Sequence, residues 1–411
     1  MKRAFERLIE YTVFETASDA MSVSYPSTVG QLVFGEFLAA ELKEIGLVDA
    51  RLNEYGYVYA TIPANIPNWS GKRLGLCAHM DVVIDPPAVG IKPRIIENYA
   101  GGDICLNEAL GIFMSTAAYP VLNDMAGRCL IVTDGTTILG ADDKAGVAEI
   151  VTAAEILMAP NAPPHGEIKI CFTPDEEIGT GTLHLDPKDF GCDFAYTCDG
   201  GAFGGIQYET FNAASAKITF SGISAHPGYA KDVMKNAARI ATEFDCLVPQ
   251  DERPEVTDGY DGFYHLTGMK GSVESAELSY ILRDHDAAVL QNRKAKILEI
   301  AALLNEKYGD GAVTAAIEDS YRNMGEVIKD HSHLVDAAAA AIRAAGREPV
   351  IRPVRGGTDG SNLSFMDIPC PNIGDGSYNV HSRMEFVCAE EMDSCVEVIL
   401  SLATYYTTFC Q

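Results

Sequence analysis

Apolar residues recur with helical spacing and with strand-like spacing in turn along the first half of the chain. Apolar positions three or four apart predict two helices, Ala4–Ala17 and Gly30–Ile45, and the Ala-rich segment Ala145–Met158 predicts a third. Short apolar runs predict the strands Gly56–Ile62, Arg73–Ala78, Cys129–Thr133, Glu167–Thr173 and Phe194–Cys198. Strands that alternate with crossover helices predict the α/β class, with a mostly parallel sheet flanked by helices.

The pattern changes after about Tyr208 and returns near residue 334. The elements predicted between them are the strand Ala213–Ser221, the helix Val233–Asp245, the strands Phe263–Lys270 and Glu277–Arg283, the helix Ala287–Tyr308 and the strand Ala312–Asp319. This β-α-β-β-α-β order is the ferredoxin-like plan of a small α+β domain. The α/β pattern then resumes with the helix Leu334–Ala345, the strand Glu348–Val354 and the helix Ala389–Thr408.

The return of the first pattern predicts one domain inserted into another. A chain of 411 residues suggests two or three domains at about 150 residues each, and two is our expectation. We assign residues 1–209 and 322–411 to the α/β domain and residues 210–321 to the inserted domain.

Composition and charge narrow the class of protein. Hydrophobic residues make up 47% and charged residues 22% of the chain, which is typical of a globular protein. The formal net charge of −27 repels phosphate backbones and anionic lipids, so we expect neither a nucleic-acid nor a membrane partner. No apolar run approaches the roughly 20 residues of a membrane span.

The cysteines and the N-terminus predict a cytoplasmic location. Eleven cysteines are present, an odd number without a C-x-x-C pair, and several stand inside apolar runs that predict buried strands. That usage is typical of reduced thiols in the cytosol. Glu6 and Glu10 interrupt the N-terminal segment before the apolar core of a signal peptide could form.

Five short polar motifs each follow a strand-like run. They are His79-Met80-Asp81, Gly140–Gly146 with its adjacent Asp142 and Asp143, Pro174–Gly179 with Asp175, Glu176 and Glu177, Asp199-Gly200-Gly201, and His381. The carboxyl ends of parallel strands meet at one edge of a sheet, where ligand sites form, so we expect these motifs to converge.

Each motif alone also has an ordinary structural explanation. His79 can be a strand-end histidine beside a solvated Asp81, and the Asp142–Asp143 pair can cap a helix. Glu176 and Glu177 can lie in a solvated turn, although adjacent like charges favour a site where cations neutralise them. Together the motifs supply imidazoles and carboxylates, the donor set that suits zinc, with Co²⁺ or Mn²⁺ as substitutes.

The chain resembles the peptidase T family, tripeptide aminopeptidases within the co-catalytic zinc peptidases. The resemblance runs through Glu97–Tyr99, Gly101–Ile104, Leu139–Gly146, Phe172–Gly179, Phe211–Ser215, Gly262–Leu266, Arg355–Gly360 and Leu363–Pro371. It implies an enzyme that removes the N-terminal residue from short peptides, preferably tripeptides, with two Zn²⁺ ions per subunit. A homodimer formed through the inserted lid domain is a further implication.

The resemblance also implies a role for each motif. Asp142 would bridge two zinc ions, with His79 and Asp199 completing one site and Glu177 and His381 the other. Asp81 would orient His79, and Glu176 would be the general base for attack by a zinc-bridging hydroxide. In the inserted domain, His226 and Arg283 resemble lid residues that bind the substrate, and Arg355 is a second candidate for its carboxylate. One departure is Val82, where the family usually has Thr.

Two alternative hypotheses about the function stay open at this point. A dipeptidase, a carboxypeptidase or an N-acyl-amino-acid hydrolase would share the zinc residues and differ in the lid. A binding protein that has lost hydrolysis would have no chemical reason to keep Glu176 beside Glu177, and Glu176 is present.

Overall fold

The computed structural model describes residues 1–409, which form two compact units. The first unit comprises residues 1–208, 326–352 and the chain from 358 onward, and the second comprises residues 209–325 and 353–357. The α/β class with a second α+β part is therefore confirmed. Arg355 packs with the second unit, although the sequence places its segment in the first domain.

An eight-stranded sheet forms the centre of the first unit, with the strand order β1-β2-β8-β3-β9-β16-β10-β15. Its strands are β1 (Arg51–Leu52), β2 (Val58–Ile62), β8 (Ile168–Thr173), β3 (Leu74–His79), β9 (Phe194–Cys198), β16 (Asn372–Ile373), β10 (Gly205–Gln207) and β15 (Val350–Ile351). The neighbours β8, β3, β9 and β16 run parallel, whereas β1 with β2, β2 with β8 and β10 with β16 are antiparallel. Every residue of β3 is buried, as expected of a central strand covered on both faces.

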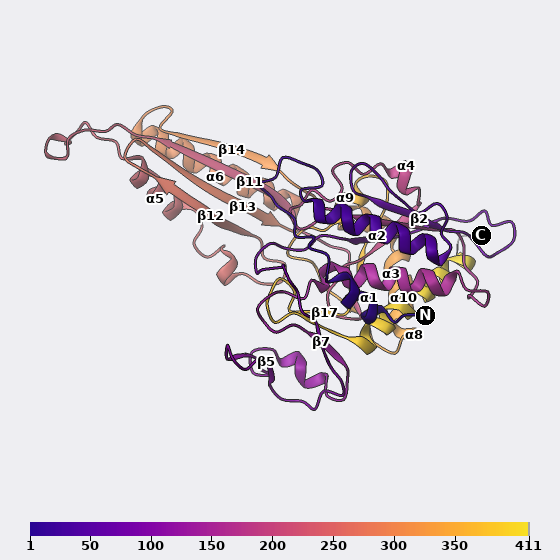
Figure 1. Ribbon diagram of the computed structural model, residues 1–411. Helices are drawn as coiled ribbons and strands as arrows, with labels where there is room; N and C mark the ends of the chain where they lie inside the picture. The colour runs from indigo at the N-terminus through magenta and orange to yellow at the C-terminus, as the bar shows by residue number, and fades with distance from the viewer. Residues whose placement is uncertain (410–411) are drawn as a thin grey trace. The chain divides into compact units, whose positions relative to one another are not determined.

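Helices cover both faces of this sheet (Figure 1). One face carries α1 (Ala4–Tyr11), α2 (Val29–Ile45), α3 (Ala141–Leu157), α8 (His333–Ala344) and α10 (Ala389–Phe409), which pack on one another. The other carries the short α4 (Pro187–Phe190) and α9 (Asp359–Ser364), whose Phe190 and Leu363 join a core cluster with Cys77 and Cys171 of the sheet. None of the helices that the structure describes is long and apolar enough to span a membrane.

A smaller sheet and a hairpin complete the first unit. The small sheet contains β17 (Ser377–Tyr378), β18 (Phe386–Cys388), β7 (Leu130–Val132) and β4 (Arg94–Ile96). The hairpin pairs β5 (Ile104–Asn107) with β6 (Ile112–Met114). Tyr378, Phe386, Leu130 and Ile104 share one core cluster, which joins the hairpin to the small sheet.

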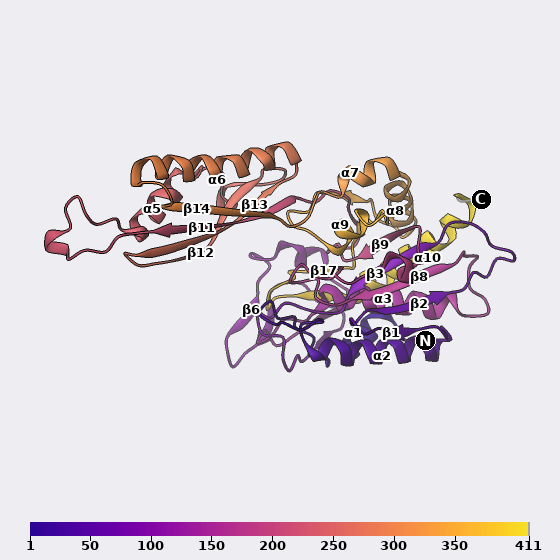
Figure 2. The same ribbon diagram turned by 90° about the horizontal axis from the view of Figure 1, so that it is seen from above.

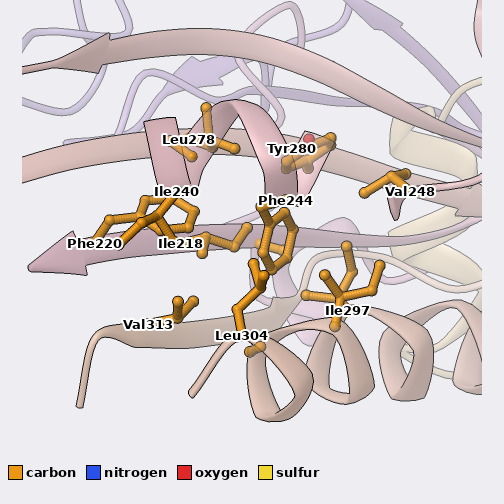
Figure 3. Packing of buried hydrophobic residues seen from close by; sticks show 14 of the residues in the cluster. Ile218, Phe220, Ile240, Phe244, Val248, Leu278, Tyr280, Ile297, Leu304 and Val313 are labelled. Atoms are coloured by element: carbon orange, nitrogen blue, oxygen red, sulfur yellow. The ribbon is translucent and has the colours of Figure 1, made fainter. Parts of the chain in front are cut away.

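The second unit is a four-stranded antiparallel sheet with two helices on one face (Figure 2). Its strand order is β12-β13-β11-β14, and the elements are β11 (Asn212–Ser221), α5 (Ala237–Leu247), β12 (Phe263–Gly271), β13 (Ser275–Asp284), α6 (Ala287–Tyr308) and β14 (Val313–Asp319). Buried and exposed residues alternate along β11 because one face of the sheet packs on the helices. The core between sheet and helices contains Ile218, Phe244 and Leu304 (Figure 3).

Three elements differ from the sequence prediction for local reasons. The helix predicted to reach Ala17 ends at Tyr11. The Thr12 hydroxyl donates to the Ile9 carbonyl and so provides a hydrogen-bond partner for a carbonyl group of the last turn. The helix predicted from Val233 begins at Ala237, because the Asn236 side chain caps it. The strand predicted over Glu348–Val354 shrinks to β15, since Pro349 and Pro353 on either side have no N–H to donate.

Leu304 and Leu298 test how far the core of the second unit depends on α6. Leu304 is 1% exposed and Leu298 is 50% exposed, and both lie on this helix. We expect Leu304→Ala to lower the free energy of unfolding by about 2–5 kcal/mol, because it leaves a cavity. Leu298→Ala should change it by roughly 0.5 kcal/mol or less. Chemical denaturation of both variants measures the difference, and equal losses would contradict this packing.

Candidate metal centre

His79 ends β3 and stands at the edge of the sheet where the neighbouring parallel strands also end. Its partner in register is Thr173, the last residue of β8. The His79 side chain is buried, with Nε2 lying 3.0 Å from Asp142 Oδ1. On the other side of the ring, Nδ1 lies 3.1 Å from the Asp81 carbonyl oxygen and 3.3 Å from Asp81 Oδ1. The ring is therefore fixed from its Nδ1 side while Nε2 faces a carboxylate.

Asp81 also holds the loop that follows β8. Its carboxylate accepts the backbone N–H of Glu176 at 3.0 Å and that of Glu177 at 3.1 Å. One buried carboxylate thus joins the end of β3 to the acidic segment after β8. The position suits the orienting role predicted for Asp81, because a metal-ligating histidine is usually held through its second ring nitrogen.

The carboxylate of Asp142 lies between two imidazoles. Asp142 Oδ1 is 3.0 Å from His79 Nε2, and Asp142 Oδ2 is 3.1 Å from His381 Nε2. Asp142 has φ −80° and ψ 102°, outside the helical range, so its side chain leaves the start of α3 in a different direction from the helix that follows. His381 adopts φ +57° and its side chain is 48% exposed. This is the arrangement that a carboxylate shared between two cations requires.

Glu177 completes the outer side of the cluster. Its Oε1 lies 3.0 Å from His381 Nε2, yet this buried oxygen has no hydrogen-bond partner of acceptable geometry among the described residues. One ligand atom each from His79, Asp142 and Glu177 lie within 4.8 Å of one another. A buried carboxylate oxygen without a donor fits a cation better than it fits a protein partner.

Asp199 follows β9 and lies close to His79. Ligand atoms of His79, Asp143 and Asp199 also lie within 4.8 Å of one another. Asp143, however, already accepts the His79 backbone N–H at 3.0 Å and the Gly146 N–H at 3.2 Å. Asp143 therefore takes the capping role at α3, and Asp142 is the member of the pair that is directed at both histidines.

Charge is strongly unbalanced in this cluster. Burial, reinforced by the Asp142 charge, raises the pKa of Asp199 well above its usual value. Burial lowers the pKa of His79, but its contacts with Asp142 and Asp81 outweigh that effect and raise the pKa well above its usual value. The carboxylates of Asp142 and Glu177 beside it raise the pKa of His381 to about 10. The excess of carboxylates over cationic groups and the mix of imidazole and carboxylate donors fit divalent metal ions.

Glu176 belongs to neither of the two groups of ligand atoms. Burial raises the pKa of Glu176 well above its usual value, against the opposing effect of His79 and with the help of Asp199. Its loop is fixed from behind by Asp175, which adopts φ +55° and accepts the Ser27 N–H at 2.6 Å and the Gln31 amide at 2.7 Å. The third carboxylate of the acidic run is thus a support for Glu176 and Glu177, and the sequence pattern did not distinguish it from them.

Glu385 is a residue of this centre that sequence reasoning missed. Its buried carboxylate accepts four successive backbone N–H groups, from Leu139 at 2.7 Å, Gly140 and Ala141 at 2.8 Å and Asp142 at 3.1 Å. Burial raises the pKa of Glu385 to about 7 although these hydrogen bonds oppose the shift. The sequence carries no signal for this role, because Glu385 is a single acidic residue far from position 142 in the chain.

The three predicted substrate residues all belong to the second unit, including Arg355, which the sequence places in the first domain. Arg283 donates to the carbonyl oxygens of Leu282 at 3.0 Å and Ala214 at 3.3 Å. Arg355 donates to the carbonyl oxygens of Gly259 and Asp261, and its guanidinium lies over two phenylalanine rings. Neither arginine forms an ion pair with an acidic side chain of the described residues. His226 is exposed, and its Nδ1 accepts the Gly228 N–H.

The chain belongs to peptidase family M20/M25/M40, whose family model matches residues 135–405. Members of this family depend on metal ions. Relatives that match over nearly their full length include enzymes named peptidase T. The one from Caldanaerobacter subterraneus subsp. tengcongensis is 48% identical over 99% of both chains, and one from Vibrio cholerae serotype O1 is 47% identical over 98% of both. The resemblance seen in the sequence is confirmed, and the chain is a peptidase.

Solved structures agree on the fold. An aminopeptidase from Bacillus cereus has a TM-score of 0.77 at 21% identity, and the match covers 99% of this chain and 98% of that one. A tripeptidase from Staphylococcus aureus has a TM-score of 0.78 at 21% identity, with 98% of both chains covered. A Bacillus subtilis protein of the same family, described as a dinuclear metal-binding peptidase, has a TM-score of 0.63 at 15% identity over 99% of both chains.

Glu385→Gln tests whether Glu385 positions Asp142. The substitution keeps the size of the side chain but places an NH₂ group against backbone N–H donors, so we expect the turn at Asp142 to shift. Metal affinity, measured by titration calorimetry, should fall about 10-fold to 100-fold, the range seen when residues that support metal ligands are replaced. Glu397→Gln, an exposed residue of α10, is the control and should leave metal affinity unchanged. Equal affinities for the two variants would refute this role.

Proposed function

We propose that the chain is an aminopeptidase that releases the N-terminal residue from short peptides, preferably tripeptides, with two zinc ions per subunit. The observation that carries this proposal is the Asp142 carboxylate, with one oxygen on each of two histidines. The names of the peptidase T relatives and of the Staphylococcus aureus tripeptidase support the substrate class. Co²⁺ and Mn²⁺ suit the same donor set and are the possible substitutes.

The ligands divide into two sets around Asp142. His79 and Asp199 would hold one ion, Glu177 and His381 the other, and Asp142 would contact both. The proximity of ligand atoms of His79 and Asp199 supports the first set, and the 3.0 Å approach of Glu177 Oε1 to His381 Nε2 supports the second. When bound, the two ions would polarise the scissile carbonyl and make a water molecule more acidic at neutral pH.

Glu176 is the general base of the proposed reaction. Its carboxylate takes a proton from the attacking water and then delivers it to the amine of the departing dipeptide. A raised pKa suits both steps, because the group must accept the proton and give it back near neutral pH. Asp81 supports the same step by holding the Glu176 N–H while it fixes the His79 ring.

The second unit is proposed as a lid that recognises the ends of the substrate. Arg283 and Arg355 are cations without a carboxylate partner among the described residues, and either fork suits the C-terminal carboxylate of a peptide. His226 would donate to the oxygen that becomes negative in the transition state. A cytoplasmic location and a homodimer formed through this unit complete the proposal.

Substrate length separates this function from the others that the same metal residues serve. Purified, metal-loaded protein should hydrolyse tripeptides faster than dipeptides or tetrapeptides, and it should not hydrolyse N-acetylated amino acids. Removal of the metal with a chelator should abolish turnover, and added Zn²⁺ should restore it. A preference for a blocked N-terminus would exclude an aminopeptidase in favour of an N-acyl-amino-acid hydrolase.

Glu176→Ala should separate metal binding from proton transfer. Because Glu176 lies outside both groups of ligand atoms, the variant should bind the same number of metal ions as the unchanged chain. Its kcat on a tripeptide should fall by about 10² to 10⁴, the usual contribution of a general base. Glu108→Ala, an exposed residue of the β5–β6 turn, serves as the control. Unchanged turnover in the Glu176 variant would remove Glu176 from the reaction.

A further inference from the structure

A hollow of about 340 Å³ in the first unit is lined by the segments that lead to two of the proposed metal ligands. Gly200, Ala202 and Phe203 belong to the segment that follows Asp199, and Tyr378 precedes His381 by three positions. None of the residues proposed for the metal centre lines the hollow. Its volume falls within the roughly 300–1,000 Å³ typical of small-molecule sites.

The charge around this hollow is positive although the chain as a whole carries −27. Arg347 and Arg352 line it, and no acidic side chain does. The remaining lining is mostly apolar, with Val121, Phe203 and Tyr378 among it. Two guanidinium groups beside apolar side chains suit a ligand that has both a negative charge and an apolar group.

Arg347 is held in place by its neighbours. Its Nη1 donates to Glu391 Oε1 at 2.7 Å, and its guanidinium carbon lies 5.5 Å from the centre of the Phe203 ring. Gly204, at φ +90°, leaves room for the arginine, since a Cβ there would come within 3.1 Å of its Cδ. The remaining N–H groups of this guanidinium donate to none of the described residues.

Glu391 does not neutralise the positive charge. The same Oε1 atom also accepts Arg128 Nη1 at 2.6 Å, while Oε2 accepts the Tyr378 hydroxyl at 2.6 Å. Two guanidinium groups therefore share one buried carboxylate, which leaves a net positive charge before Arg352 is counted. An exposed guanidinium that a buried carboxylate holds in one orientation is well placed to donate hydrogen bonds to an anion.

A second hollow of about 530 Å³ shares Val121, Phe203 and Arg347 with the first. Asp124 and Glu390 line it as well, so both signs of charge are present there. The lining of the larger hollow is therefore of mixed charge, whereas the charged side chains that line the smaller one are both arginines.

We propose that the smaller hollow is a second ligand site, separate from the metal centre, for a small carboxylate that carries an apolar group. A free amino acid with an apolar side chain has this chemistry. Its carboxylate pairs with the forks of Arg347 and Arg352, and its side chain packs on Phe203 and Val121.

Titration calorimetry on the metal-loaded protein tests this site with three probes. N-acetyl-L-leucine has the carboxylate and the apolar group but lacks the free amino group that the proposed reaction requires. N-acetyl-L-leucinamide lacks the carboxylate, and inorganic phosphate lacks the apolar group. We expect N-acetyl-L-leucine to bind about tenfold more tightly than either of the other two. Equal binding of the amide or of phosphate, or no binding of N-acetyl-L-leucine, would overturn the proposal.

Variants locate the binding. Arg347→Gln and Arg352→Gln should each weaken binding of N-acetyl-L-leucine about tenfold. Arg352→Gln leaves the Glu391 contacts intact, so it remains informative if Arg347→Gln disturbs the fold. Arg343→Gln is the control, because this exposed arginine pairs with Glu348 outside the hollow. Unchanged affinity in Arg352→Gln would place the ligand elsewhere. Turnover is not measured, so a failure of the proposed peptidase reaction would leave this result intact.

Discussion

Repulsion among buried carboxylates at one edge of the large sheet is the constraint on which the rest of the first unit depends. Parallel strands end there side by side, and the segments that follow them, together with the start of α3, bring five acidic side chains close to His79. These residues are Asp142, Asp143, Glu176, Glu177 and Asp199. Uncompensated charges in such a place would destabilise the fold strongly. The structure answers this constraint in two different ways.

Some of the carboxylates are satisfied by backbone N–H groups. Asp81 accepts two, Asp143 accepts two and Glu385 accepts four. These carboxylates fix the turns that carry the other acidic residues, so they act as supports. The rigidity of the centre therefore comes from hydrogen bonds between side chains and backbone at positions distant in the sequence.

The remaining carboxylates face imidazole nitrogens or one another. Asp142 and Glu177 approach His381, and Asp199 approaches His79. Carboxylates that accept backbone N–H groups surround these oxygens, an arrangement that suits a preformed site for cations. The fold alone does not decide the substrate, since a carboxypeptidase from Sulfolobus solfataricus and human carnosine dipeptidase 1 have the same fold at 14% identity.

Much of this protein follows from local sequence. The alternation of apolar strands and helices determines the α/β class, and the change of pattern after Tyr208 reveals the second part. The motifs after the strands predict that His79, Glu176 and Asp199 belong to one centre. These features can be predicted because the hydrophobic period, the secondary-structure propensity and the position of a residue at a strand end are properties of a few neighbouring residues. The tertiary structure decided which acidic residue does what. In the folded chain Asp143 caps α3, and Asp175 supports the loop that carries Glu176. Glu385, 243 residues after Asp142 in the chain, accepts the Asp142 backbone N–H. Hydrogen bonds between distant segments leave no periodic trace in the chain, so only the folded structure shows them.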